Sequence, residues 1–496
     1  MTEKEDYNNI FKSTFLFSFV RVLQILLGII RNKVVAILLG AEGVGIIGIL
    51  SNSISLLQTG SGLGISQSAV RDISEANGAG DRSKFSRILS LTNRVILISC
   101  LLGCLVTVAL SPLLSEWTFG DKSYTIAYFW LAIVVALNIL TEGQLALLKG
   151  MRQLRTLAKA SVIGSIIGLI TAVPLYYFFK KSGIVPSLII ASASSVFFSY
   201  YFARKIKYEK TKLSLEVVFK QAAPMIKMGV ALMLVSFLGL LFDLVIASYI
   251  RSRGGLEIVG YYRAGTTIIA SYFGIVITAM TTDYYPRISA IHSNNEKLQE
   301  EVNKQSEVGL VLIFPIAILF VFLSPIVIKL LYSKQFIATI AYTDYAILGT
   351  VLIVCSDSMG MILLAKQSAK IFTLFSFAQR LLFVPVYIFF YNHYGLMGLG
   401  ISYMLNVLTQ FILLAFINRY KFNISFKRRV YKQLVVVLTT ILIMVFIRRI
   451  DARSIKYLLG FGTLLFSSLY SFKYMKEVMN INLFEYFNKR GNDTYM

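Results

Sequence analysis

The chain has 496 residues, of which 56% are hydrophobic and only 15% charged, and this balance holds along its whole length. A soluble globular protein has roughly 45–50% apolar and about 25% charged residues. No polar stretch exceeds about 25 residues, which is too short to fold as a separate soluble domain. The composition therefore excludes a soluble enzyme domain and predicts an integral membrane protein.

Apolar stretches of about 20 residues, long enough to cross a bilayer as helices, follow one another along the chain. They predict an all-α polytopic membrane protein with about 14 transmembrane helices. The polar N-terminal segment has no signal-peptide pattern, so we expect the first span to stay in the protein. The predicted spans are 12–38, 45–70, 88–112, 123–146, 156–178, 183–203, 223–250, 257–283, 306–329, 338–364, 371–391, 395–418, 431–448 and 455–473.

The net charge of +24 is distributed unevenly between alternate loops. Of the 49 Lys and Arg residues, 34 lie on the side that contains the N-terminus. Cytoplasmic loops of membrane proteins carry such an excess, and Trp is enriched at the membrane interfaces. Trp117 and Trp130 flank a loop on the opposite side. The pattern predicts both termini in the cytoplasm, and it explains the positive charge without nucleic-acid binding.

The sequence repeats itself at an offset near 215 residues. EGVGII at 42–47 parallels EIVGYY at 257–262, and Ile73-Ser74 parallels Ile288-Ser289. VPLYYFF at 173–179 also parallels VPVYIFF at 384–390. Six helices in each half give both halves the same orientation, and such parallel repeats can rock about a central cavity in alternating access. We therefore predict an N-terminal six-helix lobe at 1–215, a C-terminal six-helix lobe at 216–425, and two extra helices with a cytoplasmic tail at 426–496.

Four basic residues lie inside predicted spans. Arg21 is near the middle of the first span, Arg31 and Lys33 are toward its outer end, and Arg263 is in the outer part of the eighth. An ionisable residue in the bilayer core costs from about 2.5 kcal/mol upward and normally faces an interior cavity. The planar arginine fork donates two hydrogen bonds to a phosphate and keeps its charge. These residues predict a cavity that attracts an anion such as a phosphate group, although Lys33 and Arg263 could instead reach the outer headgroups.

Three acidic residues also lie inside predicted spans, namely Asp243, Glu142 and Asp357 in helices 7, 4 and 10. Intramembrane carboxyl groups can carry a coupling proton or sodium ion. Asp243 could equally neutralise one of the arginines, and Glu142 and Asp357 could be caps at inner helix ends. The sequence leaves these alternatives open.

Motifs of other function classes are absent. There is no Walker A sequence for ATP and no pattern of catalytic residues. The three cysteines, Cys100, Cys104 and Cys355, lie in apolar stretches without metal-ligand spacing, so we expect buried small side chains and no metal site. GSGLG at 60–64 lies inside the second span, where we expect it to permit bending or close packing.

Several segments resemble the Wzx-type flippases of lipid-linked oligosaccharides, in the multidrug/oligosaccharidyl-lipid/polysaccharide exporter superfamily. They are RNKVVAILLGAEGVGIIG at 31–48, LLKGMR at 147–152, VGYYRAG at 259–265, LLYSKQF at 330–336 and LLAKQ at 363–367. The resemblance covers nearly the whole chain, including the two extra helices, and is strongest to the O-antigen and enterobacterial-common-antigen flippases.

The resemblance implies translocation of an undecaprenyl-pyrophosphate-linked oligosaccharide repeat unit from the cytoplasmic to the periplasmic leaflet of the bacterial inner membrane. It also implies essential basic residues in a central cavity, a role that fits Arg21 and Arg31. A polysaccharide polymerase and a chain-length regulator would be partners, and no cofactor other than coupling H⁺ or Na⁺ is expected. The alternatives are a drug/cation antiporter of the same superfamily, against which the excess of arginine argues, and a non-transporting scaffold of a glycan-assembly complex.

Overall fold

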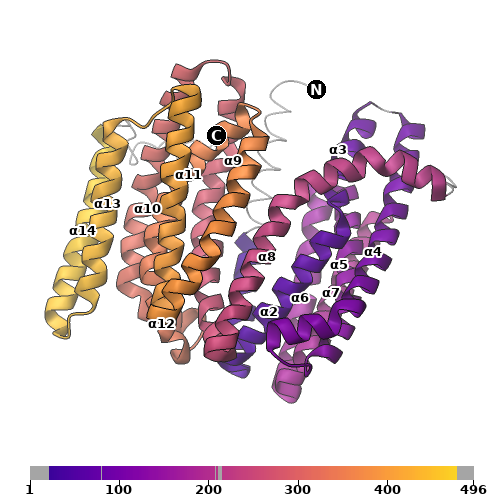
Figure 1. Cartoon of the computed structure of the whole chain (residues 1–496), viewed down its shortest axis with the longest axis horizontal. Coiled ribbons are helices and arrows are strands. Elements are labelled where there is room, and N and C mark those ends of the chain that lie inside the picture. The colour runs from indigo at the N-terminus through magenta and orange to yellow at the C-terminus, as the bar shows by residue number, and fades with distance from the viewer. Residues whose placement is uncertain (1–21, 80, 207, 210–214, 478–496) are drawn as a thin grey trace, which may run out of the picture. The chain divides into compact units, whose positions relative to one another are not determined.

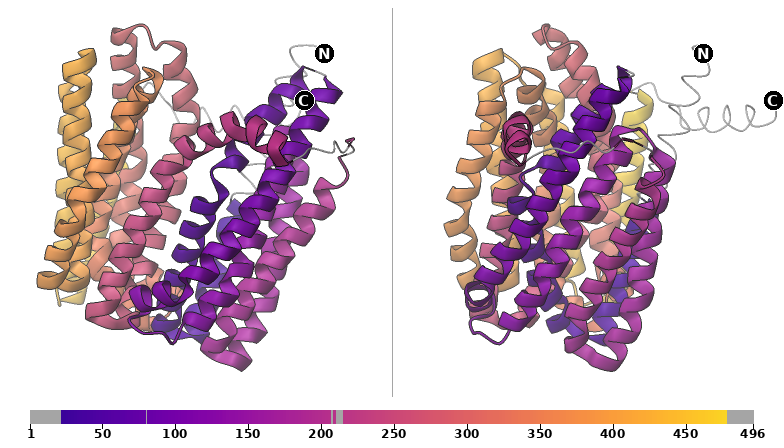
Figure 2. Two further views of the ribbon diagram at one scale, coloured as in Figure 1. Left: turned by 45° about the vertical axis from the view of Figure 1, so that its right-hand side comes forward. Right: turned by 90° about the vertical axis from the view of Figure 1, so that its right-hand side faces the viewer.

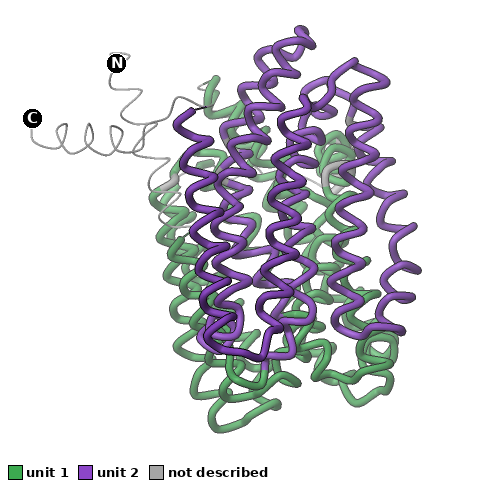
Figure 3. The backbone as a smooth tube through the Cα atoms, turned by 90° about the vertical axis from the view of Figure 1, so that its left-hand side faces the viewer, with its two compact units in different colours: residues 1–263, 331–335 green, residues 264–330, 336–496 purple. Residues whose placement is uncertain are grey.

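The computed structural model describes residues 22–79, 81–206, 208–209 and 215–477. They form helices joined by short loops, with no strand in these ranges (Figure 1). The chain divides into two compact units, which Figure 3 colours separately. Unit 1 is residues 1–263 with 331–335, and unit 2 is residues 264–330 with 336–496. The predicted all-α polytopic fold is confirmed.

Unit 1 begins with a helix at 22–38. Its further elements are α2 (Gly40–Gly62), α3 (Ile65–Gly78), α4 (Arg82–Phe119), α5 (Thr125–Gly150), α6 (Leu154–Phe179), the short 3₁₀ helix η1 (Lys180–Gly183), α7 (Ile184–Ala203) and most of α8 (Leu215–Thr267). The central helix is α2, whose apolar window is 78% buried. The apolar window of α6 and α7 is only 22% buried, as expected for helices that face lipid.

Unit 2 contains the end of α8, the π-helical turn η2 (Ile268–Phe273), α9 (Gly274–Ala290), α10 (Asn295–Leu331), the 3₁₀ helix η3 (Lys334–Thr339), α11 (Ile340–Ala365), α12 (Ala369–Phe422), α13 (Arg428–Arg448) and α14 (Arg453–Glu477). Here α11 is the central helix, also 78% buried in its apolar window. The last two helices, α13 and α14, run side by side, and α13 packs on α11 (Figures 1 and 2).

Two helices are too long for one crossing of the membrane. At about 1.5 Å per residue, α8 and α12 would each extend about 80 Å, against about 30 Å of hydrocarbon. Each contains one non-helical glycine, Gly255 at φ 78° and ψ 177° and Gly395 at φ 55° and ψ −134°. Each helix is therefore two consecutive spans, as the sequence predicted. Within the described residues, nine helices are long and apolar enough to cross a membrane, and these two are among them.

The predicted second span, 45–70, is wrong as a single helix. α2 ends at Gly62, Leu63 and Gly64 adopt the left-handed conformation with φ 49° and 61°, and α3 starts at Ile65. A Cβ on Gly64 would lie 2.0 Å from the carbonyl oxygen of Gly229 in α8. Only glycine permits both this backbone conformation and this close approach. The bend and close packing expected at GSGLG are thus confirmed.

The backbone itself repeats at the predicted offset of 215 residues. The helices α5 and α11 both have 26 residues and start at Thr125 and Ile340. Both end in the same cap, with the left-handed residue Arg152 at φ 54° in one and Gln367 at φ 55° in the other. Two further pairs of positive-φ residues, Gly40 with Gly255 and Lys180 with Gly395, are also 215 apart. The predicted duplication is therefore visible in the conformation as well as in the sequence.

One sequence match of the repeat is out of register. The ValPro pair at 173–174 and that at 384–385 are 211 residues apart, whereas the turns that follow them, at Lys180 and Gly395, are 215 apart. The difference of four residues is close to one helical turn of 3.6 residues. The two prolines therefore share a helix face but are not structurally equivalent positions.

Candidate functional site

The first helix carries two of the predicted basic residues, while Arg21 lies outside the described residues. Arg31 is exposed and Lys33 is half-buried. Two positions along a helix correspond to about 200° of rotation, so the two side chains leave opposite faces. Arg31 and Lys33 therefore do not form one stripe on this helix.

Arg263, the fourth predicted basic residue, is half-buried at the end of unit 1. Just before Arg263 in the chain, α8 crosses closely over the start of α2. A Cβ on Gly260 would lie 1.9 Å from the carbonyl oxygen of Ala41, and one on Gly45 would lie 2.1 Å from that of Leu256. Small residues at such a crossing let two membrane helices approach backbone to backbone. The approach brings the aliphatic part of Arg263 against Gly48, where a Cβ would be 3.1 Å from the Arg263 Cγ.

The three predicted acidic residues have different surroundings. Asp243 is exposed on α8, and Glu142 is half-buried on α5. Asp357 is half-buried on α11, eight residues before this helix ends. Asp357 is therefore not a cap of the last turn. Glu142 and Asp357 are 215 residues apart in the matching helices α5 and α11, so the duplication makes them equivalent.

A pocket in unit 2 lies beside Asp357. It is small, with a cavity volume of about 10 Å³ that has room for about one water-sized molecule, and it is partly open to the surroundings. Among the described residues, the Asp357 carboxylate has no hydrogen-bond or ion-pair partner. The lining comes from α9, α10 and α11, and consists of Ile277, Met280, Thr281, Tyr284, Gln305, Val354, Asp357 and Ser358.

The other polar groups of the pocket are held in place by hydrogen bonds. The Tyr284 hydroxyl donates to the carbonyl oxygen of Ser358 at 3.0 Å, and the Ser358 hydroxyl lies 2.8 Å from that of Ser306. The Gln305 amide nitrogen donates to the carbonyl oxygen of Met280 at 3.1 Å. These residues are inconspicuous in the sequence, because Gln305 and Ser306 follow a polar segment and resemble the start of a span.

A charged cluster adjoins this pocket through Gln305. The Arg287 guanidinium donates to the Gln305 side-chain oxygen at 3.0 Å. It also forms ion pairs of 3.3 Å with Asp283 and with Glu301. Arg287 is thus fixed by two carboxylates, and it orients the amide that faces the pocket.

Two further arginines with structural roles were not singled out from the sequence. In unit 1, Arg251 donates to the carbonyl oxygens of Thr118 at 3.0 Å and Trp117 at 3.3 Å, and so caps the end of α4. In unit 2, Arg448 of α13 forms an ion pair with Asp344 of α11 and donates to the Ser324 hydroxyl at 2.7 Å. The Arg448 and Asp344 side chains are only 11% and 4% exposed.

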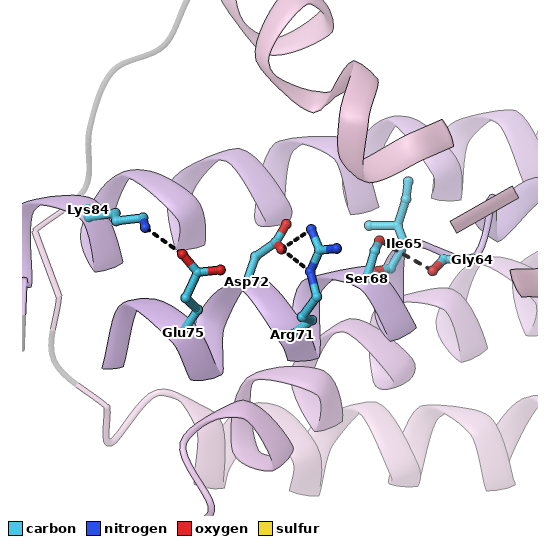
Figure 4. A network of polar contacts seen from close by, with 7 residues as sticks. All are labelled: Gly64, Ile65, Ser68, Arg71, Asp72, Glu75 and Lys84. Atoms are coloured by element: carbon cyan, nitrogen blue, oxygen red, sulfur yellow. Dashed lines mark hydrogen bonds and ion pairs between the residues drawn. The ribbon is translucent and has the colours of Figure 1, made fainter. Parts of the chain in front are cut away.

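Outside the spans, α3 carries an exposed polar network at its far end (Figure 4). Arg71 pairs with the neighbouring Asp72 at 2.8 Å, and Lys84 of α4 pairs with Glu75 at 2.8 Å. The Lys84 ammonium holds the pKa of the Glu75 carboxyl below its ordinary value through this hydrogen bond. The network joins α3 to the start of α4 at an exposed surface of unit 1.

The predicted site residues are thus distributed over both units. Arg31, Lys33, Arg263, Glu142 and Asp243 belong to unit 1, and Asp357 with its pocket belongs to unit 2. In the described parts of the chain, no group of three or more His, Cys, Asp or Glu side chains could hold a metal ion. The three cysteines are free, with Cys100 and Cys355 buried and Cys104 half-buried.

Comparison with known proteins identifies the family. A model of the family described as polysaccharide biosynthesis protein matches residues 34–341, more than half of the chain. The chain belongs to this family. A proposed O-antigen transporter of Shigella flexneri is 24% identical over 363 residues, which cover 71% of this chain and 84% of that protein. The predicted relationship is confirmed at the level of this polysaccharide biosynthesis family.

Solved structures share the fold of this family member. The lipid II flippase MurJ, in an inward closed conformation, gives a TM-score of 0.70 at 16% identity, over 95% of this chain and 100% of that chain. An inward-facing multidrug resistance transporter of the MATE family gives 0.57 at 15% identity, over 84% of this chain and 98% of that one. Both are membrane transporters, and at these identities the likeness concerns the fold alone.

Proposed function

We propose that this protein is a flippase for an undecaprenyl-pyrophosphate-linked oligosaccharide repeat unit. It would carry the unit from the cytoplasmic to the periplasmic leaflet of the inner membrane, for assembly of O-antigen or a related surface polysaccharide. The observation that carries the proposal is the family match over 34–341, together with the similarity to an O-antigen transporter along most of the chain. The fold shared with a lipid II flippase is consistent with it.

The substrate's diphosphate is the part that a cationic cavity would recognise. Arg21, Arg31, Lys33 and Arg263 are the residues that we propose for this role. A guanidinium offers a diphosphate two parallel charge-assisted hydrogen bonds and stays charged at any physiological pH. The half-buried position of Arg263 beside α2 supports its part in the proposal, because lipid-facing side chains would be more exposed.

The sequence has no ATP-binding motif, which leaves an ion gradient, the membrane potential or removal of the product as the driving force, and we propose the ion gradient. A carboxyl group inside the membrane would carry the coupling H⁺ or Na⁺, and Asp243, Glu142 and Asp357 are the available groups. Alternating access would expose the cavity to each leaflet in turn, with both termini in the cytoplasm. A polymerase and a chain-length regulator would receive the product on the periplasmic side.

An export assay in cells tests this proposal. The chromosomal gene is replaced by Arg21→Ala, Arg31→Ala or Arg263→Ala, with the exposed loop variant Lys122→Ala as the matched control. Surface glycan is measured on gels and the protein level in the membrane by immunoblot. We expect at least a tenfold loss of surface glycan in the Arg21 and Arg263 variants at normal protein level, and no loss in the control.

The same strains distinguish the rival functions. Normal surface glycan in all three arginine variants would contradict the proposed cationic site. Unchanged glycan in a strain without the gene, combined with increased drug sensitivity, would favour a drug/cation antiporter. A scaffold function would be favoured if deletion of the gene abolishes surface glycan while variants that insert normally but cannot transport still support its assembly.

A further inference from the structure

We infer that Asp357 and the pocket beside it in unit 2 bind the monovalent cation, H⁺ or Na⁺, whose gradient drives transport. This inference rests on the proposed function, and it selects one of the three acidic residues. Its starting point is the unusual situation of the Asp357 carboxylate, which is half-buried two turns before the end of a central helix and has no hydrogen-bond or ion-pair partner among the described residues.

A carboxylate in this position needs a positive charge. Burying an ion away from water is costly unless an opposite charge or hydrogen bonds compensate it. No Lys or Arg lines the pocket, so no resident side chain supplies that charge. A bound proton would neutralise the carboxylate directly, and a sodium ion would neutralise it from the adjoining space.

The pocket offers oxygen atoms suited to a small hard cation. Besides Asp357, three residues that line the pocket carry side-chain oxygens and come from three different helices, namely Thr281 of α9, Gln305 of α10 and Ser358 of α11. Carboxylate, carbonyl and hydroxyl oxygens are the ligands that hard cations prefer. Because the three helices contribute together, cation binding would tie α9, α10 and α11 to one another. Such a link is what a coupling ion needs in order to change the conformation of a transporter.

The surrounding titratable groups do not replace the cation. Tyr284 of α9 uses its hydroxyl to donate to the Ser358 carbonyl oxygen, and Tyr403 of α12, which interacts electrostatically with Asp357, carries no positive charge. The nearest cation in the described network is Arg287, which is already paired with Asp283 and Glu301. Arg287 reaches the pocket only through Gln305, so it acts as a positioning residue for the Gln305 oxygen.

The duplicated half of the chain does not reproduce this pocket. Glu142 is equivalent to Asp357, but the residue equivalent to Ser358 is Gly143. A Cβ on Gly143 would lie 2.2 Å from the Cδ1 of Ile96, so an apolar side chain occupies that place. Of the two equivalent carboxyl groups, therefore, Asp357 alone has a neighbouring hydroxyl at this position. Glu142→Gln is a matched control for Asp357→Asn, because it makes the same chemical change at the equivalent position.

The test uses the full-length protein in proteoliposomes with a fluorescent lipid-linked oligosaccharide. Translocation is measured without a gradient, with a pH gradient at equal Na⁺, and with a Na⁺ gradient at equal pH. We expect one gradient to accelerate the wild type several-fold, which identifies the cation. Asp357→Asn should remove this acceleration, while Asp357→Glu and Glu142→Gln should retain most of it. Gln305→Leu should raise the cation concentration that gives half-maximal acceleration.

Cation movement is measured independently of the oligosaccharide, with ²²Na⁺ for sodium and a trapped pH-sensitive dye for protons. Loss of gradient-driven cation flux in Asp357→Asn, but not in Glu142→Gln, supports the inference. Acceleration and flux that persist in Asp357→Asn, or that disappear only in Glu142→Gln, would overturn it. If the wild type moves cations through Asp357 but does not move the oligosaccharide, the proposed function fails and the cation site stands.

Discussion

Gly48 lies against the aliphatic part of the Arg263 side chain, and the two residues are 215 positions apart, the offset of the internal duplication. When a residue of one repeat contacts the equivalent residue of the other repeat, both residues lie near the axis that relates the repeated segments. The approaches of Gly45 to Leu256 and of Gly260 to Ala41 are reciprocal, because Gly260 is the equivalent of Gly45 and Leu256 that of Ala41 at this offset, and they define the same axis. Arg263 therefore lies near a local pseudo-twofold axis. The equivalent position in the other repeat is Gly48, so only one of the two positions carries a guanidinium.

Filling the space at Gly48 should displace Arg263 without removing its charge. We expect Gly48→Val to lower glycan export several-fold at normal membrane level, because a β-branched side chain cannot share the space with the Arg263 methylenes. Gly62→Val, in the same helix but with open space around it, is the matched control. Equal export by the two valine variants would show that the placement of Arg263 is unimportant.

The crossing of α2 and α8 should depend on its glycines. Gly260→Ala would place a Cβ 1.9 Å from a backbone oxygen, which only a shift of the helices can relieve. Overpacking of this kind typically costs about 1–3 kcal/mol. We expect a clear decrease in the thermal unfolding temperature of the purified protein in detergent. Gly62→Ala should be neutral or slightly stabilising, since alanine favours helix over glycine.

Arg448 should fix α13 to the core of unit 2. Removing one partner of a buried ion pair leaves an uncompensated charge and costs about 3–5 kcal/mol, whereas replacing both partners by apolar residues can be neutral. We therefore expect Arg448→Ala to lower the unfolding temperature strongly, and the double variant Arg448→Met with Asp344→Leu to recover most of the loss. The exposed neighbour variant Arg449→Ala should have little effect. A double variant less stable than Arg448→Ala would contradict this account.

Arg251 should stabilise the end of α4. Its guanidinium satisfies two carbonyl oxygens that the helix leaves without partners, and it lies against Gly120, whose φ is 83°. Hydrogen bonds from a charged donor contribute about 1.5–3 kcal/mol when buried, so about 1 kcal/mol is reasonable at this partly exposed position. We expect Arg251→Ala to speed cleavage or labelling at the loop after Phe119, and Arg251→Lys to restore part of the protection. Identical labelling of wild type and Arg251→Ala would rule out the capping role.

The helical architecture was predictable because the bilayer imposes long apolar stretches, which are visible without any contact information. The duplication was predictable where both repeats keep a short motif, as at Glu42 and Glu257. It was misaligned at Pro174 and Pro385, which are 211 residues apart and so differ from the offset of 215 by about one helical turn. At GSGLG a bend or close packing was expected within one span, but not a complete break after Gly62, because its cause is a backbone contact with Gly229, far along the chain.

The candidate site was only partly predictable for a related reason. A charge inside an apolar span, such as Asp357 or Arg263, is conspicuous in the sequence. Its surroundings are not, because Gln305 and Thr281 look like ordinary polar residues until folding brings α9 and α10 beside α11. Arg251 and Arg448 were missed because their partners are backbone carbonyls or residues about 100 or more positions away.

The most direct test of the central claim is translocation by the purified wild-type protein itself. Proteoliposomes receive a lipid-linked oligosaccharide carrying a label, and a membrane-impermeant reagent measures the fraction exposed in the outer leaflet over time. We predict that the protected fraction becomes accessible at least tenfold faster than in protein-free liposomes, and that a polyprenyl-linked analogue without the diphosphate is not accelerated. Accessibility that rises no faster than in protein-free liposomes, in every ion gradient tried, would contradict the account.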